Sequence, residues 1–497
     1  MTIYNAPIRD FQFLLNKLLN VEENLFGLPG FEELDHDLVN MVLEEGAKIC
    51  EEVLHPVNAV GDQQGCLFDD GAVSAPPGFK EAYSTFTESG WTALSAPPEH
   101  GGQGLPETLS FILEEMSWSA NTAFSLYCVL TRGAANLLHA YASDELKAQY
   151  LDNMVSGQWT GTMCLTEPHA GTDLALVKTR AVPQDDGSYA VSGTKIFITG
   201  GEHDLTDNII HLVLARLPDA PEGVRGISLF LVPKRLPDAD GEPGDGNNVS
   251  CGSIEHKMGI HGSPTCVMNF DAAKGYLVGE LNQGIPHMFK LMNIARLAIG
   301  TQGLGLGEVA YQNAVQYARE RLQTRSLGGV KNPGGPADPI IVHADVRRML
   351  LTTRAYVEGC RAMSLWTAMQ VDLAHRHSDP DQQRESADLI DLITPVYKAF
   401  ATDMGYETAT LCQQVFGGHG YIQETGVEQF VRDARIAQIY EGTNGIQALD
   451  LVRRKLFIHD GRLPELLFGK IDAFIAAQAN NEAAAEFIVP LEQALTC

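Results

Sequence analysis

The 497-residue sequence lacks the features that define several protein classes. It has no apolar run near the ~20 residues that a membrane-spanning helix needs. Its N-terminus has no basic stretch followed by an apolar one, so we predict no secretory signal. The nine cysteines are odd in number and include no CxxC pair, which favours free thiols over a disulfide framework. We therefore expect a cytoplasmic protein with no membrane partner.

Positive charge is also scarce. The sequence has 35 Lys and Arg against 63 Asp and Glu, which gives a formal net charge of −28. This excess disfavours nucleic acid and anionic surfaces as partners. The sequence has no Walker loop. Its histidines show no metal-ligand spacing with cysteines or acids, so we predict no metal site.

The chain divides by composition into helical, β-rich and helical parts. Residues 1–158 carry apolar residues at helical spacing, and in residues 159–285 short β-rich runs alternate with Gly, Pro and Asp clusters. Long helical patterns fill residues 286–459, as in a helix bundle. Residues 460–497 are Ala-rich and amphipathic, and we interpret them as a helical tail, an incomplete extra domain. The predicted fold class is α+β, with an N-terminal helical domain, a central antiparallel β domain and a C-terminal helical bundle.

Proline and glycine set the local expectations. A helix is expected over residues 38–53 and should end before Pro56, because proline lacks the amide hydrogen and disrupts a helix interior. Residues 61–78 are polar and rich in turn formers, which indicates a loop. The run Gly-Leu-Gly-Leu-Gly at 303–307 lies inside a helical pattern and follows no strand. It therefore indicates close helix packing rather than dinucleotide binding.

A single carboxylate, Glu441, stands between apolar residues and a glycine in the segment QIYEGTNGIQ, residues 438–447. Asn444 is a suitable N-cap, with Gln447 three residues later, so we predict that Glu441 lies on a loop before a helix. An apolar pocket raises the pKa of a carboxylate, whereas a helix N-terminus lowers it. That balance suits a general base. The alternative is a solvated surface acid.

Three further segments end in turns that could hold a ligand. Residues 163–173, MCLTEPHAGTD, form a strand followed by a Pro- and Gly-containing turn, and residues 195–201, KIFITGG, form a strand that ends in two glycines. Phe197 and Thr199 should lie on one face of that strand. Residues 416–421, FGGHGY, predict a tight bend. Each segment alone is compatible with an ordinary structural turn.

Together, the segments MCLTEPHAGTD, KIFITGG, QQVFGGHGY and IYEGTNGIQ resemble the acyl-CoA dehydrogenase family, in the order that this family has them. The resemblance covers about residues 35 to 457. The N-terminal segment and the tail are similar to a longer bacterial branch that includes 3-methylmercaptopropionyl-CoA dehydrogenases. This resemblance implies an FAD-dependent enzyme with Glu441 as its catalytic base. Some members carry the base before an arginine on a helix, and that position is Ala295 here.

The resemblance also implies binding roles for particular residues. Expected contacts of the FAD are Met163, Leu165, Thr166, Phe197, Thr199, Gln414, Gly418, Thr443 and Gly445. Arg321 and Gln323 match residues that reach the FAD of a neighbouring subunit. Expected contacts of the substrate are Thr172, Asn293, Arg296 and Gly442. The chain departs from the common pattern at Phe197, where the family more often has Trp, at Thr324–Arg325, where Phe-Gly is common, and at Asn293, which replaces a frequent Asp.

The implied reaction is the α,β-dehydrogenation of an acyl-CoA to a 2-enoyl-CoA. Glu441 would remove the α-proton and flavin N5 would accept the β-hydride. Candidate substrates are 3-methylmercaptopropionyl-CoA and a fatty acyl-CoA. The resemblance further implies a homodimer or homotetramer and an electron-transferring flavoprotein as electron acceptor.

Three alternatives remain open on the sequence. A flavin-dependent acyl-CoA oxidase of the same fold would pass electrons to oxygen and release peroxide. A non-catalytic or nucleic-acid-associated member of the fold is disfavoured by the net charge of −28 and by the presence of Glu441. A binding homologue without flavin would purify colourless.

Overall fold

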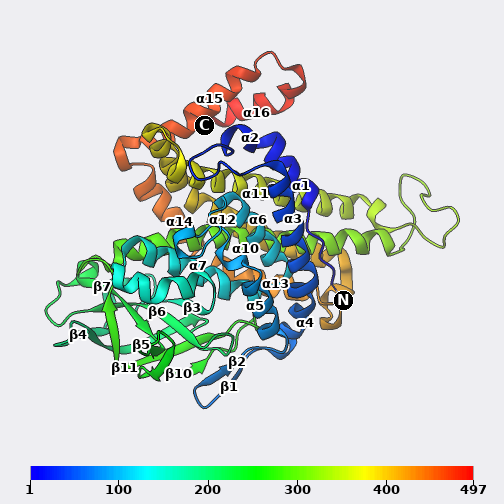
Figure 1. Ribbon diagram of the computed structural model, residues 1–497. Helices are drawn as coiled ribbons and strands as arrows, with labels where there is room; N and C mark the ends of the chain where they lie inside the picture. The colour runs from blue at the N-terminus through cyan, green and yellow to red at the C-terminus, as the bar shows by residue number, and fades with distance from the viewer. Residues whose placement is uncertain (1, 496–497) are drawn as a thin grey trace.

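The computed structural model describes residues 2–495 and shows the three predicted parts in order (Figure 1). Helices come first, a β domain follows, and long helices return after it, which confirms the α+β fold class. Cys497 lies outside the described residues. Each of the other eight cysteines is a free thiol, in agreement with the prediction. None of the helices in the described part of the chain combines the length and apolarity that a bilayer crossing requires.

The N-terminal part is a layer of helices. Its α-helices are α1 (Ile8–Phe13), α2 (Val21–Asn24), α3 (His36–Lys48), α4 (His55–Gln64), α5 (Phe79–Glu88), α6 (Glu107–Ala120), α7 (Thr122–Tyr141), α8 (Asp144–Leu146) and α9 (Asp152–Val155). Of the two longest, α6 has 13 of its 14 residues buried and α7 has 13 of its 20. Helix α7 packs against β3 of the β domain, and both helices pack against the C-terminal helices.

Two local predictions in this part are wrong. The helix expected to end before Pro56 continues through it, because a π-helical turn at Ile49–Leu54 widens the helix just before the proline. The wider turn is one of the known ways in which a helix accommodates a disrupted hydrogen-bond ladder. Residues 61–78 are not a simple loop either. They complete α4 and then form a hairpin of β1 (Leu67–Asp69) and β2 (Ala72–Ser74).

The middle part is a seven-stranded sheet with an additional short hairpin. The strands are β3 (Trp159–Cys164), β4 (Arg180–Pro183), β5 (Tyr189–Thr199), β6 (Asn208–Arg216), β7 (Ile227–Pro233), β8 (Arg235–Pro237), β9 (Pro243–Gly246), β10 (Val249–Ile254) and β11 (Thr265–Leu277). The order in the sheet is β10-β11-β5-β4-β6-β3, and β7 pairs with β11 and β6. Most pairs are antiparallel as predicted, but β3 runs parallel to β6. β4 also pairs with β6 in parallel, at Arg180 and Arg216, so the sheet is mixed.

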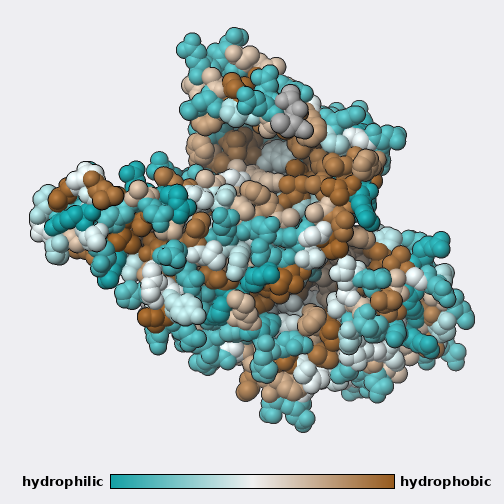
Figure 2. Space-filling model, turned by 180° about the vertical axis from the view of Figure 1, so that it is seen from behind, coloured by the Kyte–Doolittle hydropathy of each residue, from teal (hydrophilic) through white to brown (hydrophobic). Residues whose placement is uncertain are grey.

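The C-terminal part is a bundle of long helices with a helical tail. Its helices are α10 (Gly284–Glu320), α11 (Ala344–Arg376), α12 (Pro380–Phe416), α13 (Glu428–Arg435), α14 (Asn444–Asp450), α15 (Arg462–Gln478) and α16 (Ala485–Leu495). Helices α15 and α16, drawn in red, project from the body in Figure 1. The space-filling view in Figure 2 shows apolar surface beneath this projection. Large apolar side chains of the tail are exposed, including Phe468, Phe474 and Phe487, and so is Phe457 just before the tail.

Glycines let α10 and α12 pack closely, as the run at 303–307 predicted. A Cβ atom at Gly303 would lie 2.5 Å from the carbonyl oxygen of Ala401, and one at Gly405 would lie 2.3 Å from the carbonyl oxygen of Gly303. At Gly300 the nearest atoms belong to Tyr397. The contacts therefore advance in the same direction along both helices, so α10 and α12 run parallel. No larger residue fits at these crossings without a backbone shift.

We predict that Gly405→Ala destabilises the protein. The added methyl group meets the backbone of α10, which cannot rotate away, and overpacking of this kind costs about 1–3 kcal/mol. The midpoint of urea unfolding should fall. Gly359→Ala is the matched control, because this α11 glycine has no atom within 4 Å of an added Cβ. That variant should be neutral or stabilised, since alanine favours a helix. Equal losses in the two variants would contradict the packing argument.

Candidate active site

Glu441 lies on a short turn between the 3-10 segment Ile436–Gln438 and α14. Its φ is +54° and that of Gly442 is +78°, so two consecutive residues are left-handed. Such a conformation is rare for a residue with a Cβ atom and is typical of functional sites. The prediction of a loop before a helix is confirmed, but its details differ. Thr443 precedes the first helical residue, Asn444, without a side-chain cap.

The predicted capping box is absent because both of its side chains have other partners. Asn444 points to α12, where its Nδ2 donates to Asp403 Oδ1 at 2.8 Å. Gln447 donates to the carbonyl oxygens of Glu441 (3.1 Å) and Gly442 (3.0 Å) instead of binding the start of its own helix. The apolar side chains of Leu449 and Val452, which follow, are exposed rather than part of a core.

The carboxyl group of Glu441 is shielded from water although the residue is only half-buried. Its Oε2 atom has no hydrogen-bond partner among the described residues. Burial raises the pKa of Glu441 to about 7, against 4.5 for a free side chain. The cations Arg296 and Lys398 act in the opposite direction and limit the rise. The carboxyl group therefore exchanges a proton near neutral pH, which is a property of general bases.

Arg296 brings a buried cation to Glu441 from α10. It is 5% exposed, and its Nε has no partner among the described residues. Its Nη1 lies 3.5 Å from Asn293 Oδ1 and 3.8 Å from an oxygen of Asp450. The Oε1 of the buried Gln447 is unpartnered as well. Glu441, Arg296 and Gln447 thus each have an unpaired buried polar atom, and the last two side chains both approach Gly442, which suits a polar ligand nearby.

The predicted flavin contacts gather at the ends of β3 and β5. Met163 and Thr166 are partly exposed and Leu165 is buried at the end of β3. The carbonyl oxygen of Thr166 accepts the backbone N–H of Ile196 at 2.9 Å, which joins this turn to β5. Phe197 has a φ of +59° at a bulge of β5, and its ring is 59% exposed. An aromatic ring held out of the sheet in this way can stack against a planar ligand.

A buried ion pair fixes the turn after β3. Lys195 is fully buried, and its Nζ donates to Leu165 O and to Glu167 Oε1, each at 2.9 Å. Glu167 also accepts the backbone N–H groups of Lys178 and Thr179. Together, Lys195 and the donors of residues 178–179 lower the pKa of Glu167 to about 2 despite its burial. The backbone beside Thr166 is therefore rigidly held.

The other predicted contacts lie at exposed positions. Thr172 is on the loop after β3, Gln414 is near the end of α12, and Gly418 is in the bend that follows α12. Thr443 and Gly445 are exposed beside Glu441. Within the described chain, these positions are open to a ligand rather than packed in a core.

Arg321 and Gln323 lie apart from Glu441, on the connection between α10 and α11. Figure 1 shows this connection, residues 321–343, reaching away from the body. Both side chains are exposed. Asp338 organises the connection, since its carboxylate accepts backbone N–H groups of Ser326, Lys331 and Asn332 at 2.7–3.0 Å. These bonds hold the pKa of Asp338 at about 2. An extended, ordered arm is a suitable shape for reaching a second molecule.

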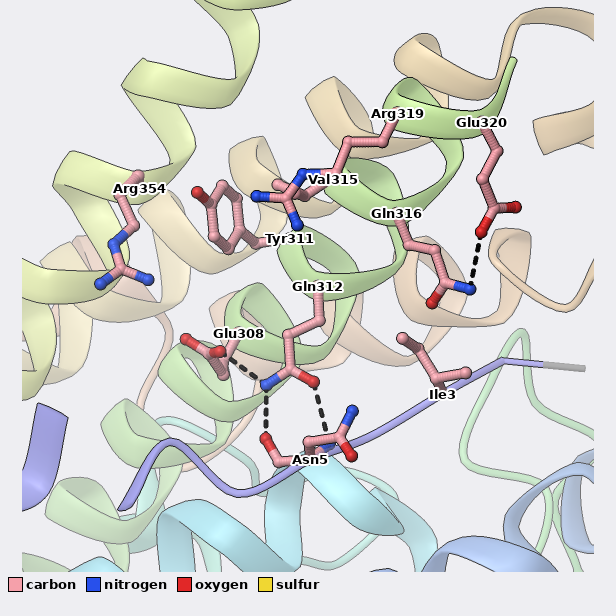
Figure 3. A pocket seen from close by; sticks show the side chains of 10 residues that line it. All are labelled: Ile3, Asn5, Glu308, Tyr311, Gln312, Val315, Gln316, Arg319, Glu320 and Arg354. Atoms are coloured by element: carbon pink, nitrogen blue, oxygen red, sulfur yellow. Dashed lines mark hydrogen bonds between the residues drawn. The ribbon is translucent and has the colours of Figure 1, made fainter. Parts of the chain in front are cut away.

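A separate groove of about 520 Å³ lies between the N-terminal segment and α10 (Figure 3). Gln312 crosses it, donating to Asn5 O and Glu308 Oε1 at 2.7 Å each. Glu308 lies 12 residues after Arg296 on the same helix, which corresponds to about 18 Å. The groove therefore belongs to another region of the molecule, and it contains none of the predicted site residues.

The structure thus assembles Glu441, Gly442, Asn293 and Arg296 in one place, and the residues of the β3 and β5 ends in another. Sequence reasoning missed the roles of Lys195, Glu167 and Lys398 and gave Gln447 a different role. These four side chains hold the two turns from behind. The available signal was the presence of a lysine inside an apolar run, as in Val396-Tyr-Lys398-Ala-Phe400. A lysine in such a setting is rarely buried without a specific partner.

Comparison with known proteins agrees with this geometry. Models of the N-terminal, middle and C-terminal domains of acyl-CoA dehydrogenases match residues 39–158, 162–273 and 282–456. The chain belongs to the acyl-CoA dehydrogenase family. As a member of this family, it is an oxidoreductase that dehydrogenates acyl-CoA thioesters and uses FAD.

Individual relatives cover most of the chain. It is 47% identical over 98% of its length to the 3-methylmercaptopropionyl-CoA dehydrogenase of Ruegeria pomeroyi, of which it covers 82%. The solved butyryl-CoA dehydrogenase of Megasphaera elsdenii is 26% identical, with a TM-score of 0.68 over 84% of this chain and 98% of that one. A structure described as an electron transferring flavoprotein of Acidaminococcus fermentans contains a chain with 26% identity and a TM-score of 0.69, over 86% of this chain and 99% of that one.

The residues present fit the FAD that this family uses. The exposed ring of Phe197 and the partly exposed Met163, Thr166 and Thr199 offer stacking surface and hydroxyl groups. The unpartnered atoms around Glu441 offer polar groups that still require a partner. Both features match a planar, polar cofactor with a substrate beside it.

The raised pKa of Glu441 predicts a pH-dependent stability difference. Between pH ~4.5 and pH ~7 the unfolded carboxyl ionises before the folded one, so wild-type stability falls as the pH rises through this window. Glu441→Gln removes this loss. Between pH 4.5 and 8, the free energy of unfolding of the variant should rise above that of the wild type by up to about 3 kcal/mol, at 1.36 kcal/mol per pKa unit. Urea unfolding of the substrate-free protein measures it.

The exposed Glu424 provides the control for this experiment. Glu424→Gln should leave the free energy of unfolding of the protein unchanged, because Glu424 is exposed in the folded protein. If Glu441→Gln also followed the wild type, its carboxyl group would be hydrated rather than shielded.

Proposed function

We propose that Glu441 is the general base that removes the α-proton of the acyl-CoA substrate. The observation that carries this proposal is a shielded carboxyl group with an unpartnered Oε2 and a pKa near 7, held on a left-handed turn. A base needs an available oxygen and a pKa close to the working pH, and Glu441 has both. Ala295 occupies the other position at which the family carries a base, so it offers no competing carboxylate.

The remaining residues orient the reactants in this proposal. Arg296 and Asn293 line the thioester channel together with Gly442 and Thr172. The backbone N–H of Glu441 stabilises the charge that develops on the thioester carbonyl. The cofactor is held by Met163, Leu165, Thr166, Phe197, Thr199, Gln414, Gly418, Thr443 and Gly445. FAD, when bound, supplies the acceptor for the β-hydride, and the product is a 2-enoyl-CoA.

Glu441→Gln should retain FAD and lose bleaching of the flavin by an acyl-CoA. The amide is nearly isosteric but cannot accept the α-proton, and loss of a general base typically costs about 10²–10⁴-fold in rate. Anaerobic stopped-flow absorbance with 3-methylmercaptopropionyl-CoA and butyryl-CoA measures the effect. Glu424→Gln should bleach like the wild type. Full bleaching by Glu441→Gln would refute the assignment of the base.

The same pair of thioesters tests the substrate. We propose a short acyl-CoA, with 3-methylmercaptopropionyl-CoA as the first candidate and a fatty acyl-CoA as the second. Support comes from the 47% identity to the dehydrogenase of Ruegeria pomeroyi, over nearly the whole chain. A higher kcat/KM for butyryl-CoA than for the thioether would favour the second candidate.

A homodimer or homotetramer is proposed from the arm at residues 321–343. Arg321 and Gln323 are exposed and lie far along α10 from Glu441, so they suit the FAD of a neighbouring subunit better than their own. The apolar residues exposed on the tail and around α14 are also compatible with subunit contacts. Thr324–Arg325 replaces the common Phe-Gly at this point, so the contact need not match that of other family members in detail.

Arg321→Ala should release FAD more readily on dilution than the wild type. The loss of one charge-assisted contact to a phosphate corresponds to about 1.5–3 kcal/mol, or roughly 10- to 100-fold in affinity. Fluorescence of the released FAD measures it, with light scattering for the oligomer. Arg319→Ala, which alters an exposed arginine two residues earlier, is the matched control. Unchanged retention of FAD at low protein concentration would contradict the contact across subunits.

Electrons are proposed to leave to an electron-transferring flavoprotein in the cytoplasm. The chain from Acidaminococcus fermentans, found in a structure described by that partner's name, supports this acceptor. The eight free thiols of the described residues are compatible with a reducing compartment. Peroxide release in air at the rate of substrate oxidation would instead identify an oxidase.

A further inference from the structure

The turn that carries Glu441 is held from behind by two buried side chains. Lys398 on α12 is fully buried, and its Nζ donates to Gly442 O and to Asn444 Oδ1 at 2.9 Å each. Gln447 on α14 is 1% exposed, and its Nε2 donates to the carbonyl oxygens of Glu441 and Gly442. Both carbonyl groups of the left-handed pair are therefore bound to donors that cannot move away.

The same turn of α12 holds both ends of the loop. Asn444 Nδ2 donates to Asp403 Oδ1 at 2.8 Å and to Thr402 Oγ1 at 3.0 Å. On the other side of Glu441, Gln438 Nε2 donates to the same oxygen of Asp403 at 2.6 Å. Lys398 lies one turn before Thr402 and Asp403 on the same helix. The left-handed backbone is thus fixed to a long helix as well as to Gln447 of α14.

Lys398 also brings charge to the base. It and Arg296 are the two cations that lower the pKa of Glu441, and burial lowers the pKa of Lys398 itself to about 8. Asp403 faces Lys398, and Asp450 faces Arg296. The remaining ionisable groups near the pair are Arg454, which binds Asp450, and the phenol of Tyr440, which donates to Gln302 Oε1 at 2.6 Å. Arg435 also binds the turn, since its Nη1 donates to Gln438 Oε1 at 3.1 Å.

We propose that Lys398 is a positioning residue for the catalytic base. It fixes the left-handed Glu441–Gly442 backbone through the Gly442 carbonyl, and it places a positive charge beside the Glu441 carboxylate. This inference rests on the proposed role of Glu441. The ammonium group favours the ionised base, and the backbone bond keeps that base directed at the substrate. Loss of the charge should therefore move the pH at which the base becomes active, whereas loss of the bond should lower the rate at every pH.

The alternative is a lysine that only stabilises the bundle. Lys455 serves as the comparison for that role. It is 5% exposed, and its Nζ lies 2.7 Å from Asp391 Oδ1, so it is a buried, paired lysine of the same helical part. It makes no contact of this kind with residues 438–447. Lys455→Met should therefore reduce stability without an effect on the base.

The test is the pH profile of flavin bleaching by an acyl-CoA in the FAD-loaded protein, measured anaerobically from about pH 5.5 to about pH 9.5. In Lys398→Met, the midpoint of the acidic limb should rise by about one pH unit, which is roughly a tenfold lower rate at the acid end. Lys398→Gln should show the same raised midpoint as Lys398→Met. Its plateau rate should be higher than that of Lys398→Met, because its amide still donates to Gly442 O. Lys455→Met should keep the wild-type midpoint.

The proposal would be overturned if both Lys398 variants kept the wild-type midpoint of the acidic limb and lost rate equally at all pH values. Lys398 would then only stabilise the structure. If Lys398→Met does not fold, Lys398→Gln alone carries the same test. The result also separates this inference from the assignment of the base. Full bleaching by Glu441→Gln would refute both, whereas an inactive Glu441→Gln together with unshifted Lys398 variants would refute only the role of Lys398.

Discussion

The close approach of α10 and α12 is the constraint on which the site depends. At Gly303 and Gly405 the two backbones touch, and there is no room for a Cβ atom on either helix. Arg296 and Lys398 each lie seven residues, about two turns, before these glycines, and the helices run parallel. Their cationic ends therefore arrive together at Glu441. A wider spacing between the helices would separate the two charges that balance the burial of the carboxyl group.

Buried lysines perform a similar task at both functional turns. Lys195 binds the Leu165 carbonyl behind the turn after β3, and Lys398 binds the Gly442 carbonyl behind the base. Each lysine is fully buried, so each bond forms where water cannot compete for the carbonyl oxygen. The chain can thus place irregular, exposed backbone where a cofactor and a substrate need it. The rigidity of the site comes from the layer behind it rather than from the loops themselves.

The sequence predicted those features that depend on local pattern. The order of helical, β and helical parts followed from periodicity, and the glycine run of α10 indicated its packing correctly. Glu441 was selected as the candidate base from its neighbourhood and a family resemblance. Pro56 was misread because a π-helical turn, set by packing, accommodates it. The roles of Asn444, Gln447 and Lys398 could not be found in this way. Their partners lie on other elements, and hydrogen bonds across about 45 residues leave no local pattern.

The arm at residues 321–343 has a thermodynamic consequence. Its backbone N–H groups already converge on the Asp338 carboxylate, so the arm has a defined shape before it meets anything. Segments that order only on contact lose part of the interaction energy to conformational entropy. An arm that is folded in advance avoids this loss, so even a modest contact area at its tip can yield useful affinity. In the proposed oligomer, Asp338 would therefore contribute to association through the shape of the arm.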